Sequence, residues 1–364
     1  VSLNRRDAFA AICINSALLL PTGAGASLLP KGPLPYQVRA VADEDMKWPA
    51  ALAAEAELAV GSKGGRIAAV GFGMYNTKPE MSAEAVRLAL EAGVRAIDTA
   101  TAYGNEKEVG QAWKASGIAR SELSLSSKLS NTDMRAGNTR KAVEASLKAL
   151  QTDYLDVYYI HSPLASTKQR AQAWEEMHKM QKEGLIRACG VCNFGVEKIK
   201  LLTAANKRLP SPEVIQAEIS PFNQRRDLVV YASTINAQVV CAAWSKLSNK
   251  DTGAKGWGAF AEICAARGMT KAQGMVVWSL NRGLVSIPRS GTASPAEVQA
   301  IQDENSPRGI KGKTFSPEDI AKIDALGAEL LATGGLGRTD GWSLKDITGP
   351  EFDPTTIRLP LVGW

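Results

Sequence analysis

Short apolar segments alternate with amphipathic segments along most of this chain, starting near residue 66. Runs of apolar and β-branched residues predict strands, and they cover residues 67–72, 94–98, 123–128, 155–161, 186–192, 214–218, 239–243 and 284–287. Between them, apolar residues recur at helical spacing, as Val109, Ala112 and Trp113 do. Eight strands that alternate with helices predict a parallel sheet and, at this length, a closed (β/α)8 TIM barrel.

The segment after the first strand distinguishes this barrel from an open sheet. A doubly wound, dinucleotide-binding sheet carries a G-x-G-x-x-G turn at that point. Here Gly71 and Gly73 are followed by Asn76 where the third glycine would stand. The sequence therefore favours the barrel. A hairpin over residues 58–69, turning at 61–65, is expected to cover its lower end.

The N-terminal segment has a different character from the rest. Arg5 and Arg6 precede an apolar run over residues 8–20, and small residues follow up to Ala26. This order is typical of an export signal, and the run is too short to span a bilayer. The arginine pair resembles a bacterial twin-arginine leader or the thylakoid-transfer part of a plastid targeting sequence; an ordinary N-terminal helix is the alternative.

These patterns predict four parts of the chain. We expect a targeting segment at residues 1–26, a linker at 27–57, a single barrel domain at 58–330 and an irregular tail at 331–364 that could form a substrate loop. The expected location is a plastid, with the thylakoid lumen as one compartment. The bacterial periplasm and the cytoplasm are alternatives.

Composition narrows the class of function. In 364 residues, 45% are hydrophobic and 22% charged, which excludes a disordered chain, a fibrous protein and a disulfide scaffold. The net charge of +6 comes without a long basic run, so a small anionic ligand fits better than nucleic acid. Only two histidines are present, and His178 is interpreted as a surface residue. Cys189 and Cys192 form a C-x-x-C pair, but within a predicted buried strand they are interpreted as buried thiols, and no metal site is expected.

Ionisable side chains gather where three successive predicted strands end. Asp98, Lys128 and His161 end these strands, and Tyr103 follows in the loop after the first of them. Each has an ordinary structural explanation by itself, but catalytic groups of barrels collect at this end. A phenol has a pKa near 10, which a neighbouring ammonium would lower. A phenol acid beside a carbonyl oriented by histidine suits hydride transfer from a cofactor.

Motifs in collinear order carry a resemblance to a known family. They lie at residues 94–110, 125–128, 153–161, 183–194, 216–218 and 287–290, and the first contains Asp98, Tyr103 and Glu106. Together they resemble the aldo-keto reductase superfamily, whose members are NAD(P)H-dependent carbonyl reductases on a (β/α)8 barrel. The resemblance implies that Tyr103 donates the proton, that Lys128 and Asp98 tune it, and that His161 orients the carbonyl.

The resemblance also implies a site for the cofactor. Asn193 and Gln216 would hold the nicotinamide carboxamide, and Trp244 would stack on its ring. Ser245 and Leu247 would line the pyrophosphate path. Arg289 and Ser290 would meet the adenosine 2′-phosphate, where a guanidinium can bind bidentately. NADPH is therefore the expected cofactor, with NADH as the alternative.

Several positions depart from the family pattern. Cys192 replaces a serine, so a hydroxyl contact to the carboxamide weakens to a thiol contact. Lys246 replaces a proline, and Tyr75 replaces a tryptophan in the expected substrate pocket. A second arginine expected after Ser290 is missing, and Glu304 with Asn305 is the candidate for the adenine contacts.

Three functions remain open from the sequence. The first is an aldehyde or ketone reductase, acting as a monomer on a small carbonyl compound without nucleic acid or membrane-spanning partners. The second is a cofactor-binding regulatory subunit that resembles the potassium-channel β-subunits. The third is a barrel whose cofactor site has decayed.

Overall fold

A ring of parallel strands forms the centre of the molecule. The computed structural model describes residue 46 and residues 48–135, 137–242, 255–289, 298–299 and 303–332. Eight strands pair in parallel in chain order, and they are β3 (Phe72–Gly73), β4 (Ala96–Asp98), β5 (Ser124–Leu129), β6 (Leu155–Ile160), β7 (Ile186–Cys192), β8 (Val214–Glu218), β9 (Gln238–Ala242) and β10 (Val285–Ser286). Backbone hydrogen bonds from Ser286 to Ala69 and from Gly71 to Ser286 join the last strand to the first. The predicted (β/α)8 barrel is confirmed.

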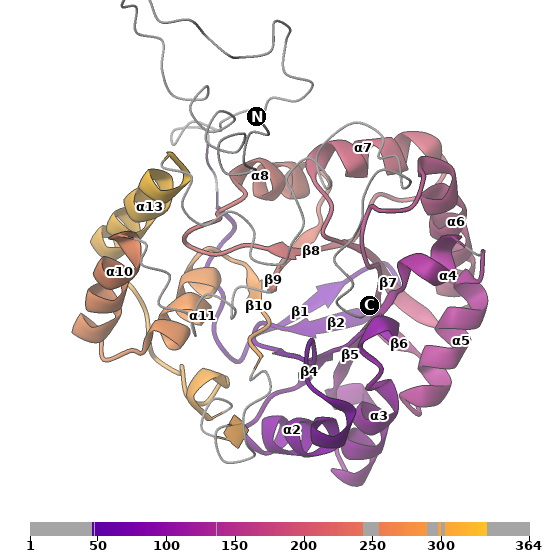
Figure 1. Ribbon diagram of the computed structural model, residues 1–364, viewed down its shortest axis with the longest axis horizontal. Coiled ribbons are helices and arrows are strands. Elements are labelled where there is room, and N and C mark those ends of the chain that lie inside the picture. Colours follow the sequence, from indigo (N-terminus) through magenta and orange to yellow (C-terminus); the bar gives the residue numbers. More distant parts are fainter. Residues whose placement is uncertain are drawn as a thin grey trace, which may run out of the picture.

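Helices surround the strands on the outside (Figure 1). The α-helices of the described residues are α2 (Pro79–Glu91), α3 (Glu106–Ala115), α4 (Asn131–Arg135), α5 (Thr139–Ala149), α6 (Thr167–Glu183), α7 (Val196–Ala205), α8 (Arg226–Thr234), α10 (Lys255–Ala266), α11 (Lys271–Asn281) and α13 (Pro317–Ala332). Two short 3-10 helices, η2 (Thr101–Tyr103) and η3 (Arg120–Glu122), lie in loops. None of the helices described is long and apolar enough to cross a membrane.

An antiparallel hairpin covers the N-terminal end of the strands. It consists of β1 (Glu57–Val60) and β2 (Gly65–Ala68). Ser124 at the start of β5 donates a hydrogen bond to the Arg66 carbonyl at 2.6 Å. Because the hairpin covers the N-terminal end of the barrel, we look for a functional site at the C-terminal end, where barrel enzymes place their sites.

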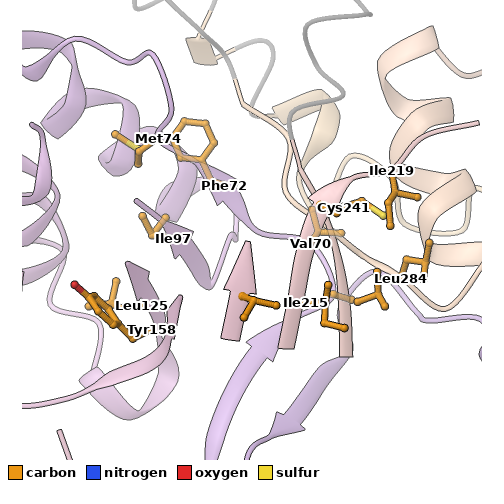
Figure 2. Packing of buried hydrophobic residues seen from close by; sticks show 14 of the residues in the cluster. Val70, Phe72, Met74, Ile97, Leu125, Tyr158, Ile215, Ile219, Cys241 and Leu284 are labelled. Atoms are coloured by element: carbon orange, nitrogen blue, oxygen red, sulfur yellow. The ribbon is translucent and has the colours of Figure 1, made fainter. Parts of the chain in front are cut away.

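Alternation along the strands divides the core into two layers. In β6, Val157 and Tyr159 point into the barrel, whereas Tyr158 and Ile160 pack against the helices. Figure 2 shows part of the outer layer, including Tyr158. Cys189 belongs to the outer layer and Cys192 to the inner one. The C-x-x-C thiols are thus buried, as expected, and they lie on opposite faces of one strand.

The strand predictions succeed except at the first strand. β7 and β8 have the predicted bounds, and the other barrel strands from β4 onward differ by a few residues. The run at 67–72, however, is divided between the hairpin strand β2 and the barrel strand β3. The apolar residues of this run belong to two different layers of the core. Because the run is apolar throughout, hydrophobicity alone does not show where β2 ends and β3 begins.

Two other expectations change when the chain is folded. His178 is buried, not a surface residue: it packs edge-on against Trp174 at 4.8 Å between ring centroids, and its Nδ1 lies 2.9 Å from Gln181 Oε1. These residues share the inner face of α6. The end of the predicted linker also packs on the barrel, because Trp48 contacts Trp278 and Leu52 donates its N–H to the Leu280 carbonyl. The segment 1–26 lies outside the described residues.

Candidate active site

A buried ion pair joins the ends of two neighbouring strands. The Lys128 ammonium of β5 donates to the Asp98 carboxylate of β4 and, at 2.8 Å, to the Thr99 carbonyl. Ser126 donates to the other carboxylate oxygen at 2.7 Å. Both charged side chains are almost completely inaccessible to solvent. Because unpaired buried charges are costly, each fixes the position of the other.

Tyr103 and His161 lie next to this pair. Tyr103 ends the short helix η2, and its hydroxyl lies 3.4 Å from Nε2 of His161, which follows β6. The Lys128 ammonium is 5.1 Å from the centroid of the Tyr103 ring. The structure therefore brings together the four residues that the strand ends predicted. The Tyr103 hydroxyl and His161 Nε2 are close enough to hydrogen-bond the same oxygen atom of a bound molecule.

Burial controls the protonation of both groups. It lowers the pKa of His161 to about 3, with the Lys128 charge acting in the same direction. His161 is consequently a neutral imidazole at neutral pH. Burial also raises the pKa of Tyr103 well above its usual value, and the Asp98 carboxylate adds to this effect. Desolvation of the phenolate is the largest cause of this rise, so the phenol keeps its proton in this arrangement. That Lys128 stabilises the phenolate and tunes Tyr103 stays a prediction.

The two predicted carboxamide-binding residues lie beside the ion pair. Gln216 donates through Nε2 to Asp98 at 3.0 Å, and its Oε1 lies 3.4 Å from the Cys192 thiol. Asn193 has a left-handed backbone, with φ of 63°, and donates through Nδ2 to the His161 carbonyl at 3.1 Å. Its Nδ2 also lies 3.2 Å from Cys192 Sγ. Both amides therefore border the group formed by Asp98 and His161.

Arg289 contacts Tyr75, the aromatic neighbour of Tyr103. Its Nη1 donates to the Tyr75 carbonyl at 3.3 Å, and its guanidinium lies 5.5 Å from the centroid of the Tyr75 ring. Tyr75 in turn packs against Tyr103, with 5.3 Å between the centroids. Burial lowers the pKa of Arg289. Within the part of the chain that is described, its Nε is buried without a hydrogen-bond partner.

Other predicted cofactor residues are not described. Trp244, Ser245, Lys246, Leu247 and Ser290 lie outside the described residues. Glu304 accepts hydrogen bonds from the Thr270 hydroxyl and, through its backbone carbonyl at 3.1 Å, from Gln273. The Glu304 carboxylate and carbonyl thus hold the start of α11, while Asn305 is buried.

The sequence alone did not identify several polar neighbours. Ser126 and Thr99 contact the ion pair directly, and Asn105 binds the adjacent loop. Ser126 had a detectable signal, since it stands two residues before Lys128 and side chains two apart face the same side of a strand. The described residues contain no group of three metal-ligating side chains that could hold an ion.

The fold and the site define a class of protein: a (β/α)8 barrel with a phenol, a neutral imidazole and a buried lysine–aspartate pair at the C-terminal ends of its strands. A family model described as the aldo/keto reductase family matches residues 68–328. This chain belongs to that family. It is an oxidoreductase of the kind that reduces carbonyl groups with a nicotinamide cofactor.

Individual relatives agree with this assignment. The chain is 38% identical over 256 residues to the methylglyoxal reductase DkgA of Salmonella typhimurium, which covers 70% of this chain and 89% of that protein. It is 33% identical to an aldo-keto reductase of Mycobacterium sp. (strain KMS), over 72% of this chain and 90% of that protein. Among solved structures, an aldo/keto reductase from Brucella melitensis superposes with a TM-score of 0.65 at 30% identity, over 74% of this chain and 99% of the other.

Proposed function

We propose that the protein reduces aldehyde or ketone carbonyls to alcohols with NADPH, and that Tyr103 is the general acid. The observation that carries this proposal is the 3.4 Å approach of the Tyr103 hydroxyl to Nε2 of a neutral His161 beside the Lys128–Asp98 pair.

The proton balance of the reaction assigns a role to each of the four side chains. When bound, the reduced nicotinamide supplies the hydride to the carbonyl carbon. The Tyr103 hydroxyl donates its proton to the carbonyl oxygen, which becomes the alcohol. Neutral His161 donates a hydrogen bond to the same oxygen and orients it. Lys128, held by Asp98, faces the Tyr103 ring and stabilises the phenolate that remains.

The residues present suit a nicotinamide dinucleotide phosphate. A carboxamide needs both a donor and an acceptor, and the amides of Asn193 and Gln216 provide both kinds beside the reacting group. A phosphate needs a cation, and the buried Nε of Arg289 has no partner among the described residues. We propose NADPH over NADH on the family resemblance at Arg289, whose guanidinium in this structure lies beside Tyr75.

The substrate class follows from the relatives and the site. The chain is similar to methylglyoxal reductases of Salmonella typhimurium and Escherichia coli, so a small 2-oxoaldehyde is the first substrate to test. Because the catalytic phenol is bordered by the Tyr75 ring at 5.3 Å, we also expect aromatic aldehydes to be reduced.

The experiment is a turnover assay of the purified protein with methylglyoxal and 4-nitrobenzaldehyde, each with NADPH and NADH. We expect oxidation of one NADPH per carbonyl consumed, with a higher kcat/KM than for NADH. NADPH should also quench tryptophan fluorescence without any carbonyl present. Quenching without turnover would favour the cofactor-binding regulatory subunit, whereas neither signal would favour a decayed cofactor site; both results would contradict the proposal.

A further inference from the structure

Two short segments hold the aromatic side chains that border the reacting group. Tyr103 lies in the segment 99–106 after β4, and Tyr75 lies in the turn 74–77 after β3. Their rings meet edge to face, with 5.3 Å between centroids and 63° between planes. The relative position of these segments therefore sets the space beside the Tyr103 hydroxyl.

One buried side chain connects both segments. Asn105 has no exposed surface. Its Oδ1 accepts a hydrogen bond from the Thr99 hydroxyl at 2.7 Å. Its Nδ2 donates to the carbonyls of Met74 and Thr77, both at 3.1 Å. The carboxamide thus closes the loop that carries Tyr103 and binds both ends of the turn that carries Tyr75.

The backbone around Asn105 indicates that its side chain is committed to this contact. Asn105 stands at the N-cap of α3, where asparagine normally accepts from the first turn of the helix. Here the cap makes no such side-chain hydrogen bond. Its side chain instead binds the turn 74–77, in which Asn76 has an uncommon left-handed backbone with φ of 59°. The Asn105 side chain therefore binds Met74 and Thr77 and does not cap α3.

Only an asparagine satisfies this position. Aspartate has the same shape but no N–H to donate to the two carbonyls, and its charge would lie against their oxygens. Alanine would remove the shared donor from both carbonyls and the acceptor from the Thr99 hydroxyl. Of the partners described, the Met74 carbonyl would keep only the Thr77 N–H, and the Thr77 carbonyl only the Ser82 hydroxyl at 3.4 Å. The bridge therefore depends on the Nδ2 donor rather than on the volume of the side chain.

We propose that Asn105 is a positioning residue that sets the spacing of Tyr75 and Tyr103, and that it thereby determines which carbonyl compounds are reduced best. This inference rests on the proposed function. With the bridge in place, Tyr75 is fixed against Tyr103, and small carbonyl compounds are confined near the phenol. Without it, the turn 74–77 is released and bulky compounds gain room.

The test is the variant Asn105→Asp, which replaces the side-chain NH2 group with an oxygen. We measure kcat and KM for methylglyoxal, 4-nitrobenzaldehyde and NADPH. Misplacement of the acid should lower kcat for methylglyoxal by about tenfold or more. The ratio of kcat/KM values should shift toward 4-nitrobenzaldehyde by about threefold or more, as expected when one wall contact changes. The KM for NADPH should stay the same.

Two further variants separate positioning from general damage. Asn138→Asp is the matched control, because Asn138 stands at the N-cap of α5 and also makes no side-chain cap bond. It should leave both substrates unaffected. Thr99→Val removes only the donor to Asn105 Oδ1 and should change the ratio in the same direction by less. Equal losses for both aldehydes in Asn105→Asp and Thr99→Val would overturn the proposal.

A readout without turnover keeps this inference separate from the proposed reaction. Amide hydrogen exchange should become faster at residues 74–77 in Asn105→Asp and unchanged in Asn138→Asp, since only the former loses the Nδ2 donor. If the wild-type protein reduces no carbonyl, the proposed function fails and this exchange still tests the bridge. Unchanged exchange at 74–77 would contradict the inference.

Discussion

Each end of the barrel contains a buried carboxylate with a cation, and the two pairs have different surroundings. At the C-terminal end, Asp98 binds Lys128. At the N-terminal end, Asp156 binds Arg120 at 2.8 Å and accepts the Leu125 N–H at 3.0 Å. The carboxylates are buried to a similar degree, so burial and ion pairing alone do not show which pair serves the proposed reaction.

The neighbours of each cation make the difference. Arg120 donates its other hydrogen bonds to neighbouring parts of the fold, including the carbonyls of Leu123 at 2.5 Å and Tyr154 at 2.8 Å. Lys128 faces the Tyr103 ring, whose hydroxyl lies beside His161. We therefore propose a chemical role for the Asp98–Lys128 pair, which borders Tyr103, and a structural one for the Asp156–Arg120 pair.

Removal of the upper cation should have the largest effect. Lys128→Met leaves the buried Asp98 uncompensated, which should cost about 3 kcal/mol of unfolding free energy. It also removes the charge beside the phenol, and kcat/KM for methylglyoxal should fall by roughly 1,000-fold, the range of a lost acid–base contribution. Urea unfolding and steady-state kinetics measure the two effects. A variant with nearly full activity would contradict the role of this pair.

Removal of the lower cation should affect stability alone. Arg120→Met breaks an ion pair that is buried to a similar extent, so the unfolding free energy should fall by about 3 kcal/mol as well. Because the N-terminal face of a barrel carries stability rather than chemistry, kcat/KM should stay within about twofold of the wild type at a temperature where the variant is folded. A large loss of activity in the folded variant would remove the distinction between the two ends.

Acid should act on His161 and on Asp156 with opposite signs. The folded pKa of His161, about 3, is below its unfolded value, so its contribution is complete above pH 6.5 and is lost as the pH falls. This loss amounts to as much as about 1.4 kcal/mol per pH unit. Burial of His178 lowers its pKa and acts in the same direction.

Asp156 behaves in the opposite way. Burial raises its pKa in the folded protein, so its contribution to stability is lost as the pH rises through that pKa and is greatest in acid. Between pH 4 and 7, the unfolding free energy should therefore change with pH less positively in His161→Asn than in the wild type, because the variant lacks the His161 contribution. An identical slope in both proteins would show that His161 is not held neutral by the fold.

The smallest expected effect concerns the thiol beside the amides. Cys192 contacts Gln216 at 3.4 Å and Asn193 at 3.2 Å through sulfur, a weak hydrogen-bonding atom. Cys192→Ser should strengthen these contacts and tighten NADPH binding by about two- to threefold, or ~0.5 kcal/mol. Cys189→Ser, on the outer face of the same strand, is the control and should leave NADPH affinity unchanged. Fluorescence titration measures both; weaker binding by Cys192→Ser would contradict the prediction.

The regular parts of the fold could be predicted from local patterns. The bounds of β7 and β8 were correct because their apolar runs stand between clear helical signals. Gly93 follows α2 with a left-handed φ of 94°, in keeping with the preference for glycine just after a helix. The first strand was not separable from the hairpin, since one continuous apolar run serves both. His178 was misplaced because local sequence does not show which face of α6 meets its neighbours.

The candidate site divides in the same way. Asp98, Tyr103, Lys128 and His161 could be found because barrel topology brings strand ends together whatever the side-chain details. The bridge formed by Asn105 could not, because its partners are backbone carbonyls 28 and 31 residues away along the chain. Nor does the sequence show that Arg289 donates to the Tyr75 carbonyl, which lies 214 residues away along the chain.

The most direct test of the central claim is the kcat/KM of Tyr103→Phe for methylglyoxal with NADPH, measured beside its NADPH dissociation constant. The ring and its packing against Tyr75 are retained, and only the proton donor is lost. The account predicts a fall of roughly 1,000-fold in kcat/KM with unchanged NADPH affinity, while the control Tyr231→Phe on α8 keeps full activity. Activity of Tyr103→Phe within tenfold of the wild type would contradict the account.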